Sequence, residues 1–307
     1  MKAILLFPGQ GSQTVGMGRA LYERHAYVRE LFAEADEVLG FGLTRLCLEG
    51  PADQLTLTAN AQPALLLVST AYWFVLQREH GIQPVAAAGH SLGEFSALVA
   101  AGSLVFAEAL RLVHERGRAM QAAVAPGRGA MAAIFGLDAD ALAALCRKHS
   151  QGSVVSPANF NGAGQIVIAG ERQAVGRVVA AAKEVGAKRA VFLQVSAPFH
   201  CELMVPAAAR LEEVLSETKI CPTVFPVLSN VTAEPYPSDV SEMRQLLVRQ
   251  VTAPVQWERC VRSLVEYSCG TAIEVGPGRV LTNLAKRMVA HWNCLSADDL
   301  DGLRGMP

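Results

Sequence analysis

The sequence has no long hydrophobic run and no excess of charge of one sign. Its longest apolar stretch, from Ala64 to Leu76, is too short to span a bilayer, which takes about 20 residues. The apolar run after Met1-Lys2 stops at Pro8-Gly9, short of the roughly 7–15 residues of a signal peptide. The formal net charge of −1 gives no argument for nucleic-acid binding. We therefore expect neither a membrane segment nor a nucleic-acid partner.

Paired cysteine motifs are also missing. The seven cysteines are scattered, their number is odd, and no C-x-x-C pair occurs, so neither a disulfide framework nor a zinc site is indicated. No internal repeat or low-complexity tract is found, and the last dozen residues, rich in Asp and Gly, predict a loose tail. We expect a metal-free protein of the reducing cytoplasm, and 307 residues are enough to bury a proper core.

Apolar runs alternate with long helical patterns over most of the chain. Ala3–Phe7 and Val85–Ala88 predict central strands that are buried on both faces. Further candidate strands are Val191–Val195, Thr223–Leu228 and Ala272–Val275, and the helical patterns include Gly18–Leu39, Gln62–Glu79 and Val105–Ala122. Strands that alternate with long helices indicate a parallel α/β sheet.

The middle of the chain has a different order. The patterns predict, in sequence, a strand, a helix, two strands, a helix and a strand: Ala130–Phe135, Ala139–Lys148, Val154–Asn159, Gln165–Ala169, Arg172–Val185 and Arg189–Val195. This β-α-β-β-α-β order is ferredoxin-like. We therefore predict a small ferredoxin-like domain at 123–198, inserted into a large α/β catalytic domain of residues 1–122 and 199–307.

A candidate nucleophile follows the second predicted strand. Gly89-His90-Ser91-Leu92-Gly93 forms a G-x-S-x-G segment between a strand pattern and a helical pattern, which is the context of a nucleophile elbow. The glycines permit a sharp turn that lifts the Ser91 hydroxyl out of the fold at a helix N-terminus. An ordinary strand–helix turn with a capping serine is the alternative. The context favours a serine that forms a covalent acyl ester.

A serine nucleophile needs a base, and elimination among the seven histidines favours His200. His200 comes shortly after Val191–Val195, at the carboxyl end of a predicted strand, where sites of parallel sheets lie. His90 is expected to point away from its neighbour Ser91. For four others, each in a helix or at a helix end among polar residues, we expect solvated roles: His25, His80, His114 and His149. His200 has no obvious acidic partner, but a backbone carbonyl would suffice to hold its tautomer.

Arg116 lies on the apolar face of the predicted helix Val105–Ala122. Polar residues occupy the opposite face at spacings of three and four, where they can form ion pairs: Glu108, Arg111, Glu115 and Arg118. A guanidinium directed into the protein needs an anion. Spacing alone leaves two alternatives open, a structural carboxylate or the carboxylate of a substrate, for which arginine has the right bidentate geometry.

With these residues in place, the chain resembles the malonyl-CoA:acyl carrier protein transacylases of fatty-acid synthesis over about residues 1–290. The segments that carry the resemblance occur in the family's order: Pro8-Gly9-Gln10-Gly11-Ser12-Gln13, Gly89-His90-Ser91-Leu92-Gly93-Glu94, Arg116-Gly117, Met120-Gln121, Asn159-Phe160-Asn161, Gln165, Pro198-Phe199-His200-Cys201, Gln250, Pro254-Val255-Gln256-Trp257 and Gly276-Pro277-Gly278. The resemblance implies an α/β-hydrolase-like parallel-sheet domain with an inserted ferredoxin-like domain.

The resemblance also implies a role for each candidate residue. Ser91 would be acylated, and His200 would be its base, oriented by the main-chain carbonyl of Gln250. The N–H groups of Gln10 and Leu92 would form the oxyanion hole, and Arg116 would bind the free carboxylate of the malonyl group. Malonyl-CoA would be the substrate, with no permanently bound cofactor and no metal.

The expected reaction transfers malonyl from CoA through Ser91 to the phosphopantetheine thiol of acyl carrier protein, and we expect a monomer. Phe199 stands where many members carry Ser, and the same Phe-His pair occurs in malonyl-selective acyltransferases of polyketide pathways. A discrete polyketide malonyl acyltransferase is therefore one alternative. A serine acyl hydrolase or thioesterase is another, against which Arg116 argues. Because the carrier protein is acidic in the family's systems, Lys188-Arg189 and Lys286-Arg287 are candidates for a basic docking patch.

Overall fold

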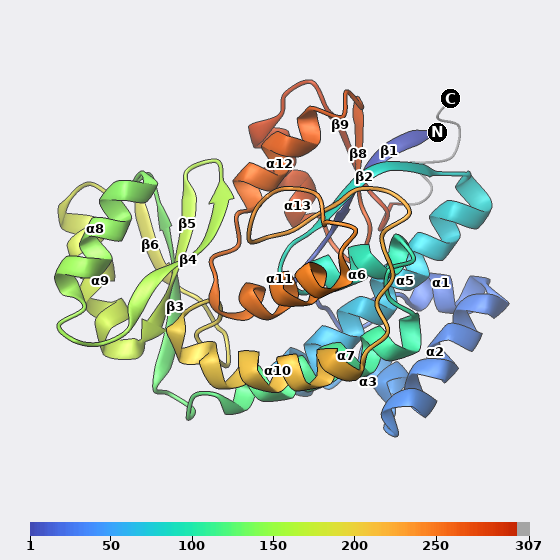
Figure 1. The fold of residues 1–307 in the computed structure, drawn as a ribbon, viewed down its shortest axis with the longest axis horizontal. Coiled ribbons are helices and arrows are strands. Elements are labelled where there is room, and N and C mark those ends of the chain that lie inside the picture. Colours follow the sequence, from blue (N-terminus) through green and yellow to red (C-terminus); the bar gives the residue numbers. More distant parts are fainter. Residues whose placement is uncertain (300–307) are drawn as a thin grey trace.

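The computed structural model describes residues 1–299, which contain two separate sheets (Figure 1). The larger sheet has five strands, all paired in parallel, in the order β7-β2-β1-β8-β9. Its strands are β1 (Lys2–Phe7), β2 (Gln83–Gly89), β7 (Val227–Leu228), β8 (Thr271–Glu274) and β9 (Asn293–Ser296). The parallel α/β sheet predicted from the alternating patterns is therefore present.

β1 shows why a central strand is apolar along its whole length. It lies between β2 and β8, and its residues from Ala3 to Phe7 are all buried. Leu5 and Phe7 belong to one hydrophobic core, whereas Ile4 and Leu6 belong to a second core on the other side of the sheet. Both faces are covered, so successive side chains, which point to opposite faces, must all be apolar.

Helices cover both faces of the larger sheet (Figure 1). They are α1 (Arg19–Arg24), α2 (Ala26–Leu39), α3 (Leu43–Glu49), α4 (Ala52–Thr56), α5 (Thr58–His80), α6 (Leu92–Ala100), α7 (Phe106–Ala122), α10 (Val205–Glu217), α11 (Val240–Thr252), α12 (Trp257–Val265) and α13 (Val280–Met288), with a short 3₁₀ turn at Glu202–Met204. Within residues 1–299, no helix is long and apolar enough to cross a membrane.

The smaller sheet is antiparallel, with the strand order β4-β5-β3-β6. Its elements follow the predicted β-α-β-β-α-β order: β3 (Gly129–Phe135), α8 (Ala139–His149), β4 (Val155–Gly162), β5 (Gln165–Glu171), α9 (Arg172–Glu184) and β6 (Arg189–Phe192). Ala132 and Ile134 of β3 pack in a core shared with α8 and α9, whereas Met131 and Ala133 belong to the core of the larger part. One face of the small sheet is thus turned toward the large sheet and its helices.

Several predicted elements have different limits in the structure. The pattern Gly18–Leu39 forms two helices, because His25 between them is extended, with φ −118° and ψ 122°. The strand predicted at Val191–Val195 ends at Phe192 and belongs to the antiparallel sheet. The strand predicted at Thr223–Leu228 shrinks to β7, and the edge strand β9 was not predicted. Residues 300–307 of the predicted tail lie outside the described residues.

Candidate active site

The turn between β2 and α6 holds Ser91 in a strained conformation. Ser91 has φ 52° and ψ −105°, outside the regions that serine ordinarily adopts, and α6 begins at the next residue. A side chain at Gly89 would collide with the backbone of Gly93, and a side chain at Gly93 would collide with the carbonyl of Phe7. The glycines therefore allow β1, β2 and α6 to approach closely enough to hold the turn.

His200 contacts the Ser91 hydroxyl directly. Its Nε2 lies 2.7 Å from Ser91 Oγ, and its Nδ1 lies 2.8 Å from the main-chain oxygen of Gln250. The carbonyl can only accept, so Nδ1 carries the proton and Nε2 is free to accept the proton of the serine hydroxyl. His200 is only 3% exposed, and this burial, with the nearby charge of Arg116, lowers its pKa to about 3. The imidazole is therefore neutral at pH 7.

His200 reaches this place by a different route from the one expected. The strand before it, β6, pairs antiparallel with β3, so the rule for carboxyl ends of parallel strands does not apply. Instead, residues 193–199 leave the small sheet and return to the large part, where His200, with φ 59°, meets Ser91 and the end of α11. The structure brings His200 to Ser91, as the predicted base requires, but the reason given for its position was wrong.

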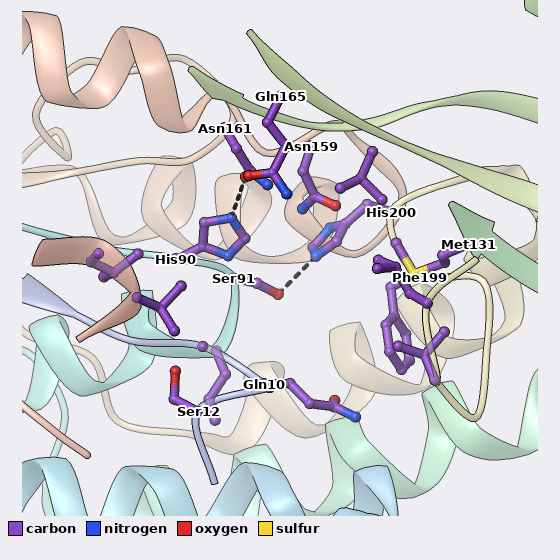
Figure 2. Close-up of a pocket in the computed structure, with 18 of the residues that line it drawn as sticks. Gln10, Ser12, His90, Ser91, Met131, Asn159, Asn161, Gln165, Phe199 and His200 are labelled. Atoms are coloured by element: carbon purple, nitrogen blue, oxygen red, sulfur yellow. Dashed lines mark hydrogen bonds between the residues drawn. The ribbon is translucent and has the colours of Figure 1, made fainter. Parts of the chain in front are cut away.

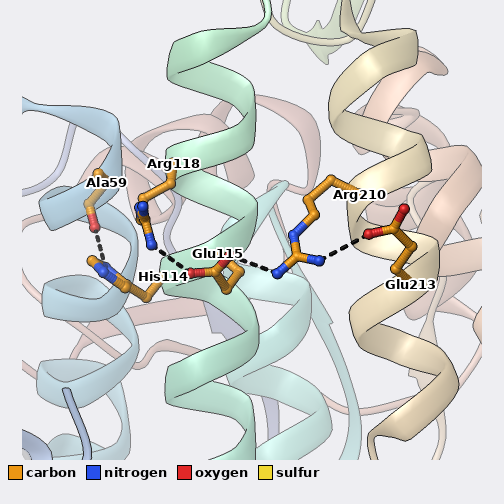
Figure 3. A network of polar contacts seen from close by, with 6 residues as sticks. All are labelled: Ala59, His114, Glu115, Arg118, Arg210 and Glu213. Atoms are coloured by element: carbon orange, nitrogen blue, oxygen red, sulfur yellow. Dashed lines mark hydrogen bonds and ion pairs between the residues drawn. The ribbon is translucent and has the colours of Figure 1, made fainter.

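The polar face of α7 fastens this helix to its neighbours (Figure 3). Glu115 pairs with Arg118 on the same helix and with Arg210 of α10, and Arg210 also pairs with Glu213. His114 Nδ1 lies 3.0 Å from the carbonyl of Ala59. Exposed pairs of this kind add little stability individually. The buried side of the helix, which includes Leu112, Arg116 and Met120, therefore decides which way α7 is turned and where Arg116 points.

Arg116 is buried, 2% exposed, and its guanidinium makes no salt bridge with a carboxylate of residues 1–299. Its Nη1 donates to Gln62 Oε1 at 2.6 Å, and its Nη2 donates to Gln250 Oε1 at 2.9 Å and to Ser91 Oγ at 3.2 Å. Its Nε is buried and has no hydrogen-bond partner among residues 1–299. Burial lowers the pKa of Arg116 to about 10, so the group remains cationic at pH 7.

A pocket of about 680 Å³ opens over these residues between the two sheets. In Figure 2, Ser91 and His200 lie at its centre, with Gln10 and Ser12 on one side and Asn161 and Gln165 of the small sheet on the other. Leu92, the first residue of α6, also lines it. The first N–H groups of a helix lack intrahelical acceptors, so they are suited to bind a negative oxygen. Met120, Met131 and Phe199 form an apolar part of the pocket wall.

Three residues beneath Ser91 were not predicted as part of the site. Asn230 accepts a hydrogen bond from the N–H of Ser91 at 2.7 Å and donates one to the carbonyl of Gly89 at 2.7 Å. Glu94 is wholly buried and accepts hydrogen bonds from the Tyr236 hydroxyl and from the backbone N–H of Asn230. A charged residue inside the apolar helix Leu92–Ala100 was the available signal, of the same kind that identified Arg116.

The other histidines differ in their surroundings. His90 Nε2 lies 2.8 Å from Asn161 Oδ1, so its ring is directed away from Ser91 and joins the elbow to the small sheet. The solvated role expected for His25 is wrong. His25 is only 8% exposed and pairs with Glu79 at 2.8 Å, because the break between α1 and α2 turns it inward.

Comparison with known proteins gives consistent matches over nearly the whole chain. Residues 4–300 match the family model described as "Acyl transferase domain". A curated malonyl CoA-acyl carrier protein transacylase of Salmonella typhimurium is 48% identical over 284 residues, 92% of each chain. The crystal structure of an acyl carrier protein S-malonyltransferase from Vibrio cholerae superposes with a TM-score of 0.94 at 46% identity, covering 99% of both chains. A malonyl-transacylase solved in complex with a type II PKS acyl-carrier protein has a TM-score of 0.95 at 46% identity, covering 99% of this chain and 98% of that one.

Proposed function

Since this chain belongs to the acyl transferase family of malonyl CoA-acyl carrier protein transacylases, we propose that it moves a malonyl group from CoA to acyl carrier protein through an ester on Ser91. The main support for this proposal is the surroundings of the Ser91 hydroxyl oxygen. Ser91 Oγ lies 2.7 Å from a neutral histidine nitrogen and 3.2 Å from a guanidinium that has no carboxylate partner in residues 1–299. A base and an anion site thus meet at the nucleophile.

In the first step, His200 Nε2 takes the proton of the Ser91 hydroxyl while Oγ attacks the thioester carbonyl carbon of malonyl-CoA. The negative oxygen that forms faces the N–H groups of Leu92 and Gln10, which line the pocket beside Ser91. When the C–S bond breaks, the sulfur of CoA leaves and receives the proton from His200. Between these two transfers His200 is an imidazolium, and its Nδ1–H remains hydrogen-bonded to the main-chain carbonyl of Gln250.

The second step reverses the first with another thiol. His200 takes the proton of the phosphopantetheine thiol of the carrier protein, and the sulfur attacks the carbonyl carbon of the malonyl ester. Ser91 Oγ then leaves and regains its proton from His200. Both steps use side chains and backbone groups of this chain alone, so we propose no permanently bound cofactor.

Arg116 is suited to bind the free carboxylate of the malonyl group. In the ester, the carboxylate is separated from Oγ by the carbonyl carbon and one methylene, and Arg116 Nη2 is already within 3.2 Å of Oγ. A buried guanidinium gains most from an anion that can accept two parallel hydrogen bonds. The absence of a protein carboxylate at this position, in the part of the chain described, favours the substrate over a structural ion pair.

We propose fatty-acid synthesis as the pathway, as the sequence resemblance implies, whereas one neighbouring structure is a malonyl-transacylase in complex with a type II PKS acyl-carrier protein. Phe199, which lines the pocket before His200, is also compatible with a polyketide role. The chemistry proposed for the site is the same in both pathways. A serine hydrolase would use water as the acceptor, and it would have no need for an unpaired cation beside the nucleophile.

We propose further that residues 1–122 and 199–307 form an α/β-hydrolase-like catalytic domain and that residues 123–198 form a ferredoxin-like domain. Support comes from the G-x-S-x-G elbow at the end of β2, the sheet order β4-β5-β3-β6 and the separate core of α8 and α9. A monomer in the cytoplasm stays a prediction from the sequence.

The proposed function is tested by intact-mass measurement. After incubation with malonyl-CoA, the protein should gain the mass of one malonyl group, and addition of holo acyl carrier protein should move that mass to the carrier. Parallel incubations with methylmalonyl-CoA and acetyl-CoA measure selectivity. Release of free malonate at a rate that the carrier does not change would identify a hydrolase instead.

His200→Ala should slow acylation by roughly 10²-fold or more, because the general base is lost. The pH profile gives a second check. Since the pKa of His200 is lowered to about 3, kcat/KM for acylation should stay level as the pH falls through 6.5, the ordinary value for histidine. An unaffected His200→Ala enzyme would remove His200 from this role, whereas a wild-type profile with half its maximum near pH 6.5 would contradict only the lowered pKa of His200.

Arg189 of the small sheet and Arg287 of α13 line the pocket and are exposed, and Lys188 and Lys286 beside them are exposed as well. Reversing both arginines to Glu should raise KM for the acidic carrier protein several-fold at low salt and spare acylation by malonyl-CoA. Arg147→Glu together with Lys148→Glu, on exposed positions of α8, is the matched control. Unchanged carrier kinetics at low salt would exclude the arginine pair from the docking surface.

A further inference from the structure

Gln250 contacts three residues of the proposed site, Ser91, His200 and Arg116. It is 1% exposed at the end of α11, and its main-chain oxygen accepts from His200. Its side-chain Oε1 accepts from Arg116 Nη2 at 2.9 Å, and its Nε2 donates to the carbonyl of Ser91 at 3.0 Å and to Glu94 Oε2 at 2.9 Å. All the polar atoms of this amide are therefore used, and their arrangement decides what Arg116 encounters.

A glutamine amide can be turned so that its oxygen and nitrogen exchange places, and its neighbours decide between the two orientations. If the amide were reversed, its NH₂ group would face the guanidinium of Arg116, which has only donors. On the other side, Glu94 Oε2 also accepts the backbone N–H of Asn230 at 2.9 Å, so this oxygen must remain an acceptor. Glu94 therefore requires the nitrogen of Gln250 to point toward it.

From this geometry we propose that Glu94 is a positioning residue that acts through Gln250. By holding Gln250 Nε2, Glu94 turns Oε1 toward Arg116 and so keeps the guanidinium directed at the acyl group on Ser91. The proposal rests on the proposed role of Arg116 in binding the malonyl carboxylate. It gives a reason for a wholly buried carboxylate on the first turn of α6, where no cation of residues 1–299 forms a salt bridge with it.

The surroundings of Glu94 fit a fixed acceptor. The Tyr236 hydroxyl binds Oε1, and two donors bind Oε2, so the carboxyl group cannot rotate without losing hydrogen bonds. Burial raises the pKa of Glu94 to about 7, and these hydrogen bonds and the charge of Arg116 counteract the rise. Since Glu94 touches neither Ser91 Oγ nor the base, it is not placed to take part in the chemistry itself.

Two substitutions separate acceptor geometry from charge. Glu94→Met keeps the length of the side chain and removes both acceptors. It should lower the malonyl-to-acetyl ratio of kcat/KM by roughly tenfold, since a small misplacement of a binding group is costly. Glu94→Gln keeps an oxygen for Gln250 and Asn230, and its ratio should stay within about threefold of wild type. Glu274→Met is the matched control, since this wholly buried carboxylate accepts hydrogen bonds at the start of α13, from the N–H groups of Leu281 and Thr282.

The measurement is single-turnover acylation of the full chain by malonyl-CoA and by acetyl-CoA, with folding checked by thermal unfolding. An unchanged ratio in a folded Glu94→Met protein would overturn the proposal, as would an equal fall in the Glu274→Met control. If Glu94→Met does not fold, the Glu94→Gln protein decides. A tenfold fall in its malonyl-to-acetyl ratio would contradict the proposal, because the acceptor for Gln250 is still present and only the charge is lost. Arg116→Ala is measured alongside. An unchanged ratio in Arg116→Ala would contradict the role of Arg116. A ratio that falls in Arg116→Ala but not in Glu94→Met would contradict only the role of Glu94.

Discussion

Ser91→Ala should abolish the malonyl adduct and reduce transfer to the carrier protein by several powers of ten. The reason is that covalent catalysis has no substitute in this pocket: no second hydroxyl or thiol lies within hydrogen-bond distance of His200 Nε2 in residues 1–299. The remaining contacts of His200 and Arg116 with Gln250 do not involve the serine hydroxyl, so the variant should stay folded and should still bind malonyl-CoA.

The adduct is measured by intact mass after incubation with malonyl-CoA. Ser96→Ala is the matched control, because Ser96 is a buried serine of α6, the helix that follows Ser91, and its hydroxyl has no hydrogen-bond partner in the described residues. It should be acylated like wild type. An adduct of undiminished yield on Ser91→Ala protein would show that another residue carries the acyl group.

Arg116→Ala should weaken malonyl transfer by roughly 10²-fold or more, while acetyl transfer is spared or improved. Malonate supplies a carboxylate for two charge-assisted hydrogen bonds, each worth about 1.5–3 kcal/mol, and acetyl supplies none. Acetyl-CoA leaves the wild-type guanidinium buried without an anion, so removal of the cation takes away a cost that only this substrate bears. The decisive quantity is the malonyl-to-acetyl ratio of kcat/KM.

Arg116→Lys should restore only part of the ratio, because an ammonium group cannot form the planar pair of hydrogen bonds. Arg118→Ala on the same helix is the matched control, since Arg118 is exposed and pairs with Glu115 (Figure 3), and its ratio should not change. A structural arginine would behave differently: Arg116→Ala would lower the melting temperature and depress both activities together. An unchanged ratio in a folded Arg116→Ala protein would contradict the substrate role.

Local patterns were sufficient to predict most of the elements and to propose a nucleophile. β1 and α7 were predicted to within one residue of their observed ends, because burial on both faces or on one face leaves a regular apolar pattern. Ser91 was found because its elbow is encoded by consecutive residues. Arg116 stood out because a charge on an apolar helix face is rare and needs a reason. Each of these signals lies within a single short segment of the chain and needs no contact with a distant one.

Contacts between distant segments could not be predicted in this way. β7 and β9 are short strands at the two edges of the large sheet, and their pairing with β2 and β8 depends on the rest of the sheet rather than on their own few residues. The interpretation of His25 as solvated failed for the same kind of reason, since Glu79 and the break between α1 and α2 lie outside its local pattern.

The sequence by itself determined the order of the elements, the serine at the elbow, the histidine chosen by elimination and the arginine that needs an anion. Only the tertiary structure decided that His200 meets Ser91 across 109 residues and that a backbone carbonyl, which every residue possesses, orients its imidazole. It also decided that Glu94, Gln250 and Arg116 form one connected set. Hydrogen bonds between distant segments depend on positions in space, and the packing of the two cores fixes those positions after the local elements have formed.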